Sequence, residues 1–262
     1  MRAIKSARAN NLIYSKGTTM AGFVFYRGKS PIDGAPIVAI ATLESKNGKT
    51  GDMVQTWILR EDISPLMAIK TGADRSICGN CIHRGAEEDQ ERTCYVDASR
   101  APTMVFDAYH RGQYIDLSQD PETIAILIAQ RVVRMGAYGD PAMVPIKQWR
   151  MLLAAAAGRT GYTHAWRRVW AQALRPYVMA SVDSQSEMDL ARAMGWRTFR
   201  VRTESEPLKV NEFACPASPE GGMRKLCITC KACDGADRVG KASAAIIVHG
   251  SMAKYFAQHA LV

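Results

Sequence analysis

The sequence predicts an α/β fold, namely a partial or complete (β/α) barrel that carries metal-bound cysteine loops and begins with an N-terminal β-hairpin. Three observations support this prediction. Two β-type runs joined by a turn-rich loop lie in the N-terminal part, short apolar strands then alternate with helix-like segments, and the seven cysteines fall into two sets. A doubly wound open sheet is the alternative arrangement for the same alternation.

The predicted hairpin consists of Ala35–Leu43 and Met53–Leu59, two runs rich in residues that favour strands. Residues 45–51 between them contain Ser, Asn and Gly, a composition typical of turns. Residues 1–35 show little periodicity, and we interpret them as an arm or a short strand that leads into the hairpin. Residues 72–97 also lack periodicity but contain the first cysteines, so we expect a loop that a metal orders.

Strands and helices alternate after residue 100, which predicts βαβ units with parallel, neighbouring strands and helices packed outside them. The expected strands are Val132–Ala137, Thr160–His164, Tyr177–Val182, Thr198–Val201 and Ala244–Val248. The expected helices are Ala101–His110, Pro121–Gln130 with Asp120 as its N-cap, Ile146–Ala157, a segment that ends at Leu174, and Ser186–Met194.

We divide the chain into residues 1–100, which hold the arm, the hairpin and the first cysteine loop, and residues 101–262, which hold the barrel-like region and the C-terminal cysteines. The two parts are expected to form one structural unit. No apolar run is long enough to span a bilayer and no signal peptide is recognisable, so we expect a cytoplasmic protein without a membrane partner. In a reducing compartment, clustered cysteines hold metal more often than they form disulfides.

The net charge of +9 favours an anionic partner, either a nucleotide or a nucleic acid. The alternative is a charge that serves only solubility, and the scattered distribution of the basic residues fits that alternative as well.

The C-terminal cysteines form the stronger metal-binding pattern. Cys227, Cys230 and Cys233 follow a C-x2-C-x2-C spacing, and Cys215, which precedes a proline, lies upstream. Three cysteines at this spacing wrap one loop around a cuboidal cluster, as in bacterial ferredoxins, so we predict a [4Fe–4S] cluster. A structural four-cysteine zinc site is the alternative.

The N-terminal cysteines are Cys78, Cys81 and Cys94. Three thiolates leave one coordination position, which either His83 fills to give a closed zinc site, or a cofactor or substrate fills to give an open, catalytic one.

These residues resemble the radical S-adenosylmethionine superfamily, whose members hold a [4Fe–4S] cluster with three cysteines in a loop near the start of a barrel. Tyr95 follows the last cysteine, as in many members, and the segment 133–141 around Gly139 and Asp140 is similar to the glycine–acid motif that binds the cofactor's methionine amino group. The resemblance implies one or two [4Fe–4S] clusters and S-adenosylmethionine, held with the help of these three residues. The spacing here is C-x2-C-x12-C, whereas C-x3-C-x2-C is usual in that superfamily.

Most of the chain also resembles an uncharacterised cysteine-rich family of bacteriophages and mobile elements, on its CxxC…CYV, GDP and CPAS…CxxCxxC segments. For a phage-encoded chain, the expected location is the host cytoplasm.

Polar residues recur at the ends of the predicted strands, where barrels carry their chemistry. These candidate catalytic residues are Asp140, His164, Asp183 and His249.

Three functions follow as hypotheses. The first is an iron–sulfur enzyme of radical S-adenosylmethionine type that acts on a nucleotide or nucleic acid. The second is a zinc-stabilised nucleic-acid-binding protein without catalysis. The third is a zinc-dependent base-modifying barrel enzyme, in which Cys230 or Cys233 acts with His249.

Overall fold

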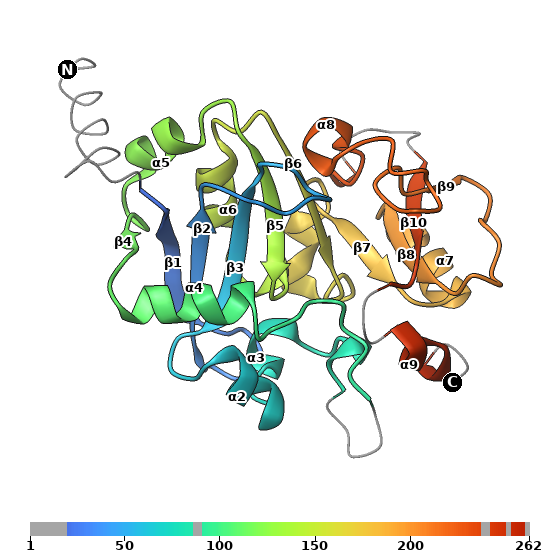
Figure 1. Cartoon of the computed structure of the whole chain (residues 1–262), viewed down its shortest axis with the longest axis horizontal. Helices are drawn as coiled ribbons and strands as arrows, with labels where there is room; N and C mark the ends of the chain where they lie inside the picture. The colour runs from blue at the N-terminus through green and yellow to red at the C-terminus, as the bar shows by residue number, and fades with distance from the viewer. Residues whose placement is uncertain (1–19, 86–90, 237–241, 250–252, 260–262) are drawn as a thin grey trace.

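The computed structural model describes residues 20–85, 91–236, 242–249 and 253–259. One sheet of ten strands runs through the molecule in the order β4-β1-β2-β3-β5-β6-β7-β8-β10-β9 (Figure 1). The strands are β1 (Gly22–Lys29), β2 (Pro36–Thr42), β3 (Val54–Arg60), β4 (Ile115–Asp116), β5 (Val132–Tyr138), β6 (Gly158–Thr163), β7 (Met179–Val182), β8 (Thr198–Arg202), β9 (Glu212–Ala214) and β10 (Ser243–Ile247).

The N-terminal part of the sheet is antiparallel and the remainder is parallel. β1 pairs with β2 and β2 with β3 in antiparallel register, so the two runs of the predicted hairpin are adjacent strands and the arm before them contributes a third, β1. From β3 onward, every pairing to β5, β6, β7, β8, β10 and β9 is parallel. The α/β prediction and the predicted parallel neighbours β5 to β8 are therefore confirmed.

The strand order is that of an open sheet. β4 and β9 lie at its two ends, and within the described residues they do not pair with each other. β6 bonds to β5 through residues 158–161 and to β7 through residues 162–163 only. The sheet bends at β6, since β7 runs obliquely to β5 in Figure 1. Closure into a barrel stays a prediction.

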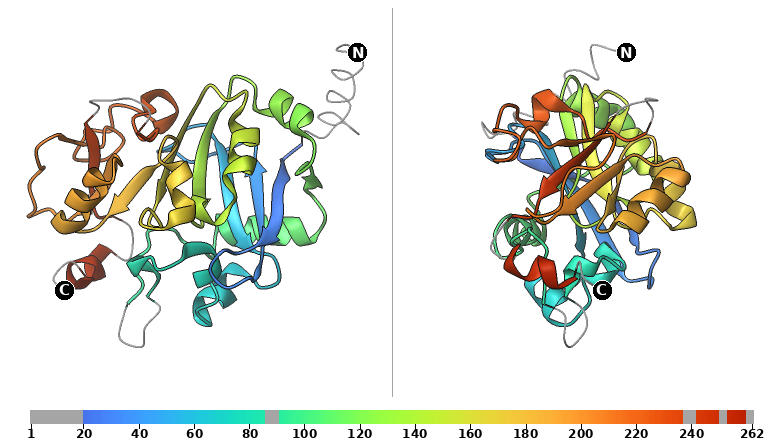
Figure 2. Two further views of the ribbon diagram at one scale, coloured as in Figure 1. Left: turned by 180° about the vertical axis from the view of Figure 1, so that it is seen from behind. Right: turned by 90° about the vertical axis from the view of Figure 1, so that its right-hand side faces the viewer.

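Helices cover both faces of the sheet. The α-helices are α2 (Pro65–Lys70), α3 (Arg75–Cys78), α4 (Ala101–His110), α5 (Pro121–Ile128), α6 (Ile146–Leu153), α7 (Gln185–Ala193), α8 (Cys227–Cys230) and α9 (Ala253–His259). The 3-10 helices are η2 (Ile82–Arg84), η3 (Pro141–Met143) and η4 (Val169–Leu174). α4 lies on the near face of the sheet in Figure 1, and α6 lies on the opposite face, visible in the left view of Figure 2.

The helix boundaries follow local sequence signals in most places. Asp120 caps α5, because its carboxylate accepts a hydrogen bond from the amide of Thr123 at 3.0 Å. α7 ends before Gly195, whose φ of +79° closes the helix. The segment predicted as a helix up to Leu174 is instead a short 3-10 helix, and the helices predicted to reach residues 130 and 157 end at residues 128 and 153. No helix in the described ranges combines the length and apolar character that a membrane span requires.

Candidate functional site

The first cysteine set comprises Cys78, Cys81 and Cys94, and backbone hydrogen bonds bring its distant member to the other two. Cys78 ends α3, and Cys81 directly precedes η2. The amides of Thr93 and Cys94 both donate to the carbonyl oxygen of His83, at 3.2 and 3.0 Å. These bonds close the loop between Cys81 and Cys94, so the long sequence spacing does not separate the three thiols.

A buried ion pair holds this cysteine loop at the carboxyl ends of the parallel strands. The Arg84 guanidinium lies 2.6 Å from Asp74 Oδ1 and also donates to the carbonyl oxygen of Gly79 at 3.2 Å. Both charged side chains are almost fully buried. The amide of Asp140, just beyond β5, donates to the carbonyl oxygen of Ile77 at 2.7 Å and so joins α3 to the end of that strand.

Burial raises the pKa of two thiols of the first set, those of Cys78 and Cys94. It raises the pKa of the Cys78 thiol well above its ordinary value, and Asp74 and the other two thiols add to the effect. Burial also raises the pKa of the Cys94 thiol, against the opposing charge of Arg92. Without a metal these thiols stay protonated and unreactive, whereas a metal ion displaces the proton from a thiol that it binds.

The second cysteine set comprises Cys215, Cys227, Cys230 and Cys233. The amide of Cys215 donates to the carbonyl oxygen of Ala245 in β10 at 2.9 Å, and the carbonyl oxygen of Cys233 accepts from the amide of Gly161 in β6 at 3.1 Å. α8, which holds the middle two cysteines, is bonded to the β2–β3 loop through the amide of Cys227 and the carbonyl oxygen of Lys49, at 3.2 Å. Figure 1 shows α8 and α3 beyond opposite ends of the parallel strands.

The thiols of the second set are mutual electrostatic neighbours. Burial raises the pKa of Cys233 to about 12, and the charges of the three other thiols of the set add to this rise, while the Tyr162 hydroxyl opposes it. Burial likewise raises the pKa of Cys227.

Two cations lie beside the second set without a carboxylate partner among the described residues. Arg134 donates to the Tyr95 hydroxyl oxygen at 2.6 Å, and the Lys49 ammonium lies 3.2 Å from His249 Nε2. Burial lowers the pKa of Lys49, although the neighbouring thiols oppose this effect. The Tyr95 and His249 rings stack at 5.8 Å. The arrangement links Tyr95, next to the first set, to the cations beside the second set.

Both cysteine sets line one cavity of about 1170 Å³. Of the other residues predicted for the site, five also line it: Tyr95, Gly139, Asp140, His164 and His249. Asp183 is not among the lining residues, but it is bonded to His83 and close to His164, which are. All but one of the predicted site residues therefore face a common space.

The spacing of the sulfur atoms bears on the choice of metal. Within the described residues, a single group of three potential metal ligands has all its ligand atoms within 4.8 Å of one another. This group contains no cysteine. A tetrahedral zinc site with Zn–S bonds of about 2.3 Å places its sulfur atoms about 3.8 Å apart. A cuboidal cluster binds each thiolate to a different iron and separates the sulfur atoms further. Among the described residues, neither cysteine set forms a group as compact as this cysteine-free group.

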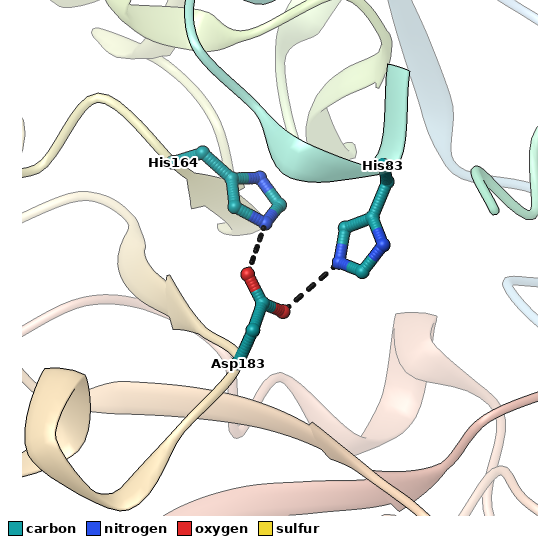
Figure 3. A group of neighbouring side chains, drawn as sticks. All are labelled: His83, His164 and Asp183. Carbon is teal, nitrogen blue, oxygen red and sulfur yellow. Dashed lines mark hydrogen bonds and ion pairs between the residues drawn. The ribbon is translucent and has the colours of Figure 1, made fainter. Parts of the chain in front are cut away.

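The compact group without cysteine consists of His83, His164 and Asp183 (Figure 3). His83 Nε2 lies 2.9 Å from Asp183 Oδ1, and His164 Nε2 lies 3.4 Å from Asp183 Oδ2. Burial opposes charge on both His164 and Asp183, but their mutual attraction, with Cys81 beside the histidine, raises the pKa of His164 and lowers that of Asp183. His83 Nδ1 lies 2.7 Å from Thr93 Oγ1. Both ring nitrogens of His83 thus have partners other than the thiols.

Asp140 and Gly139 have local structural tasks. The Asp140 carboxylate accepts hydrogen bonds from the Thr163 hydroxyl at 2.7 Å and from the amides of Ala142 and His164, both at 2.8 Å. Gly139 has a φ of +76°, and a Cβ atom there would lie 2.6 Å from the carbonyl oxygen of Ile58. The glycine–acid segment therefore packs β5 against β3 and fixes the turn that contains His164.

Sequence reasoning did not identify four residues of the site: Lys49, Thr93, Arg134 and Tyr162. Arg134 and Tyr162 lie on the predicted strands β5 and β6, but their alignment with the second cysteine set depends on the bend of the sheet at β6. Of these four residues, only Thr93 could have been suspected from the sequence, because it directly precedes Cys94.

Comparison with protein-family models, with curated proteins and with solved structures found no match to this chain.

Proposed function

We propose that this protein is an iron–sulfur enzyme of radical S-adenosylmethionine type that acts on a nucleotide or nucleic acid. The observation that carries the proposal is that the two cysteine sets line the same large cavity, the first with three thiols and the second with four. A three-thiolate set leaves one iron of a [4Fe–4S] cluster open to an external ligand, and a four-thiolate set closes its cluster.

Both sets supply thiolates, the ligands that iron–sulfur clusters use. The ring nitrogens of His83 contact Thr93 and Asp183, so this histidine is engaged elsewhere than with the thiols. Cys78, Cys81 and Cys94 would hold the open cluster, and the second set would hold an auxiliary one. When bound, the open cluster together with S-adenosylmethionine would supply one-electron chemistry.

The protein's own residues would bind the substrate and exclude water from the cavity. Lys49 and Arg134 line the cavity, and their side-chain partners among the described residues are His249 and Tyr95 rather than carboxylates. Next to the second set these cations offset the negative charge of metal-bound thiolates, and they also attract a phosphate group that enters the cavity. Trp57 and Tyr95 line the same space and offer flat faces on which a base can stack.

The test is the metal and sulfide content of the chain purified without oxygen. We expect iron and acid-labile sulfide in equal amounts, with part of both lost in Cys78→Ser and a different part lost in Cys230→Ser. Asp97→Asn, which changes an exposed residue near the first set, is the control and should retain the wild-type content. Stoichiometric zinc without sulfide would contradict the proposal.

The second candidate is a zinc-stabilised nucleic-acid-binding protein without catalysis. It is favoured by the way the second set joins distant segments, because α8 bonds to the β2–β3 loop and Cys215 and Cys233 bond to β10 and β6. Zinc content together with salt-dependent binding of oligonucleotides, and no effect of S-adenosylmethionine, would support this candidate.

A further inference from the structure

We infer that His83, His164 and Asp183 bind one divalent first-row transition-metal ion at a site whose ligands include no cysteine. The inference does not depend on the proposed iron–sulfur function. The ligand atoms are His83 Nε2, His164 Nε2 and a carboxylate oxygen of Asp183, and all lie within 4.8 Å of one another. Figure 3 shows the three side chains converging from three different segments.

Each ligand is fixed by the fold. His83 belongs to η2, while His164 and Asp183 directly follow the paired parallel strands β6 and β7. Asp140 Oδ2 accepts the amide hydrogen of His164 at 2.8 Å, and Glu187 Oε2 accepts that of Asp183 at 2.8 Å. A metal site needs this rigidity, because loosely held ligands bind weakly.

The hydrogen bond to Thr93 prepares His83 for metal binding. Thr93 is buried, and its Oγ1 lies 2.7 Å from His83 Nδ1. Histidines that bind a metal through one ring nitrogen commonly donate the N–H of the other to an oxygen atom, which fixes the ring. With the proton on Nδ1, His83 Nε2 has a lone pair for a metal ion, and the ion would replace the 2.9 Å contact between this atom and Asp183 Oδ1.

The second histidine leaves a ring nitrogen without a hydrogen bond. His164 Nε2 is buried and forms no hydrogen bond, although 26% of the side chain is exposed. The nearest carboxylate oxygen, Asp183 Oδ2, is 3.4 Å away. This ion-pair contact is longer than an ordinary hydrogen bond. A metal ion between the three ligands would give His164 Nε2 a direct bond instead.

The ligand types define the class of ion. Two imidazoles and one carboxylate suit Fe²⁺, Mn²⁺, Co²⁺ or Zn²⁺, and three protein ligands leave further positions open for water or a small ligand. His83 and His164 line the large cavity, so those open positions are accessible from it.

Mn²⁺ is the suitable probe, because it prefers nitrogen and oxygen ligands and does not compete for thiolates. Titration of the full chain is followed by the electron paramagnetic resonance signal of free Mn²⁺. We expect one bound Mn²⁺ per wild-type chain, and affinity weaker by about tenfold or more in Asp183→Asn and His164→Gln. Two changes outside the site, Asp189→Asn on α7 and His110→Gln on α4, should leave the affinity unchanged.

Thr93→Val gives an independent check, since it removes only the hydrogen bond that fixes His83. It should weaken Mn²⁺ binding by about tenfold. Circular dichroism establishes that each variant is folded, and Mn²⁺ should raise the melting temperature of the wild type but not that of Asp183→Asn. If either ligand variant does not fold, Thr93→Val and the wild-type stoichiometry decide the matter.

Two results would overturn the inference. One is the absence of saturable Mn²⁺ binding to the wild type, which would leave the group as an ion pair. The other is binding that survives in the folded ligand variants but disappears in Cys78→Ser, which would assign the ion to the first cysteine set. Iron and sulfide content, measured on the same samples, reports separately on the proposed clusters.

Discussion

Replacing Asp140 with alanine tests whether this residue anchors the site or binds a cofactor. The carboxylate is buried, and both oxygens are already engaged. Oδ1 accepts from the Ala142 amide at 2.8 Å and the Thr163 hydroxyl at 2.7 Å. Oδ2 accepts from the amides of His164 at 2.8 Å and Ala165 at 3.3 Å. Asp140→Ala removes the acceptor of the Ala142 and His164 amides and of the Thr163 hydroxyl, whereas the Ala165 amide keeps a second acceptor, Thr163 Oγ1, at 3.0 Å.

The expected loss of stability follows from these contacts. A buried donor left without a partner costs about 1–3 kcal/mol. Three of the four contacts are short, so even the lower limit predicts a loss of at least about 3 kcal/mol in the free energy of unfolding. For a chain of this size, 1 kcal/mol lowers the melting temperature by about 2–4 °C. Asp140→Ala should therefore melt at least about 6 °C below the wild type.

The measurement is a thermal melt followed by circular dichroism, with Asp189→Ala as the matched control. Asp189 is exposed on α7 and bonds to Gln185 on the same helix, so its replacement should change the stability by no more than about 0.5 kcal/mol. If Asp140→Ala melts within about 2 °C of that control, Asp140 is not an anchor. The cofactor-binding role that the sequence resemblance implies would then be the better explanation.

Three further predictions concern other parts of the molecule. Gly139→Ala should destabilise the protein more than Gly72→Ala in denaturant titrations. Both glycines have a positive φ, but only at Gly139 would the added Cβ meet a neighbour, the carbonyl oxygen of Ile58 in β3, at 2.6 Å. Equal losses of stability would refute this packing argument. Burial, and then a hydrogen bond to a glutamate, raise the pKa of Tyr109 from 10.0 to about 12, so the folded state keeps a proton that the unfolded state releases. The contribution of Tyr109 to the free energy of unfolding is complete below pH 10.0 and is lost as the pH rises toward about 12. Between these two pH values, the free energy of unfolding of Tyr109→Phe should therefore fall less than that of the wild type. Lys49→Met should weaken the binding of a phosphate-bearing nucleotide and reduce its dependence on salt, whereas the exposed Lys70→Met should not; equal effects would place the phosphate elsewhere.

The parallel part of the fold was predictable from the sequence because it depends on local patterns. Apolar strands of ordinary length alternate with helical segments between residues 121 and 202, and α5 and α7 among these segments have side-chain caps. The chirality of βαβ units then makes the strands parallel neighbours. β4 and β9 could not be predicted, since strands of two and three residues have no measurable alternation. η4 was predicted as an α-helix because apolar spacing does not distinguish the two helix types over six residues.

The sequence was sufficient to divide the cysteines into two sets, but it did not predict that both sets line one cavity. That arrangement depends on the backbone bonds from Thr93 and Cys94 to His83, and on the bend at β6 where Gly161 bonds to Cys233. Both are long-range contacts without a sequence signature. The partner of His83 could not be predicted for the same reason. The sequence suggested His83 as a fourth ligand of the first set, but its partner Asp183 lies 100 residues away in the chain.

The central claim is that the first cysteine set holds a cluster with one iron open to the cavity. Its most direct test is the electron paramagnetic resonance spectrum of the reduced, anaerobically purified chain, recorded with and without S-adenosylmethionine. The account predicts an iron–sulfur signal that changes when S-adenosylmethionine is added, in the wild type and in Cys230→Ser, but not in Cys81→Ser. A spectrum without an iron–sulfur signal, or a signal that S-adenosylmethionine leaves unchanged, would contradict the account.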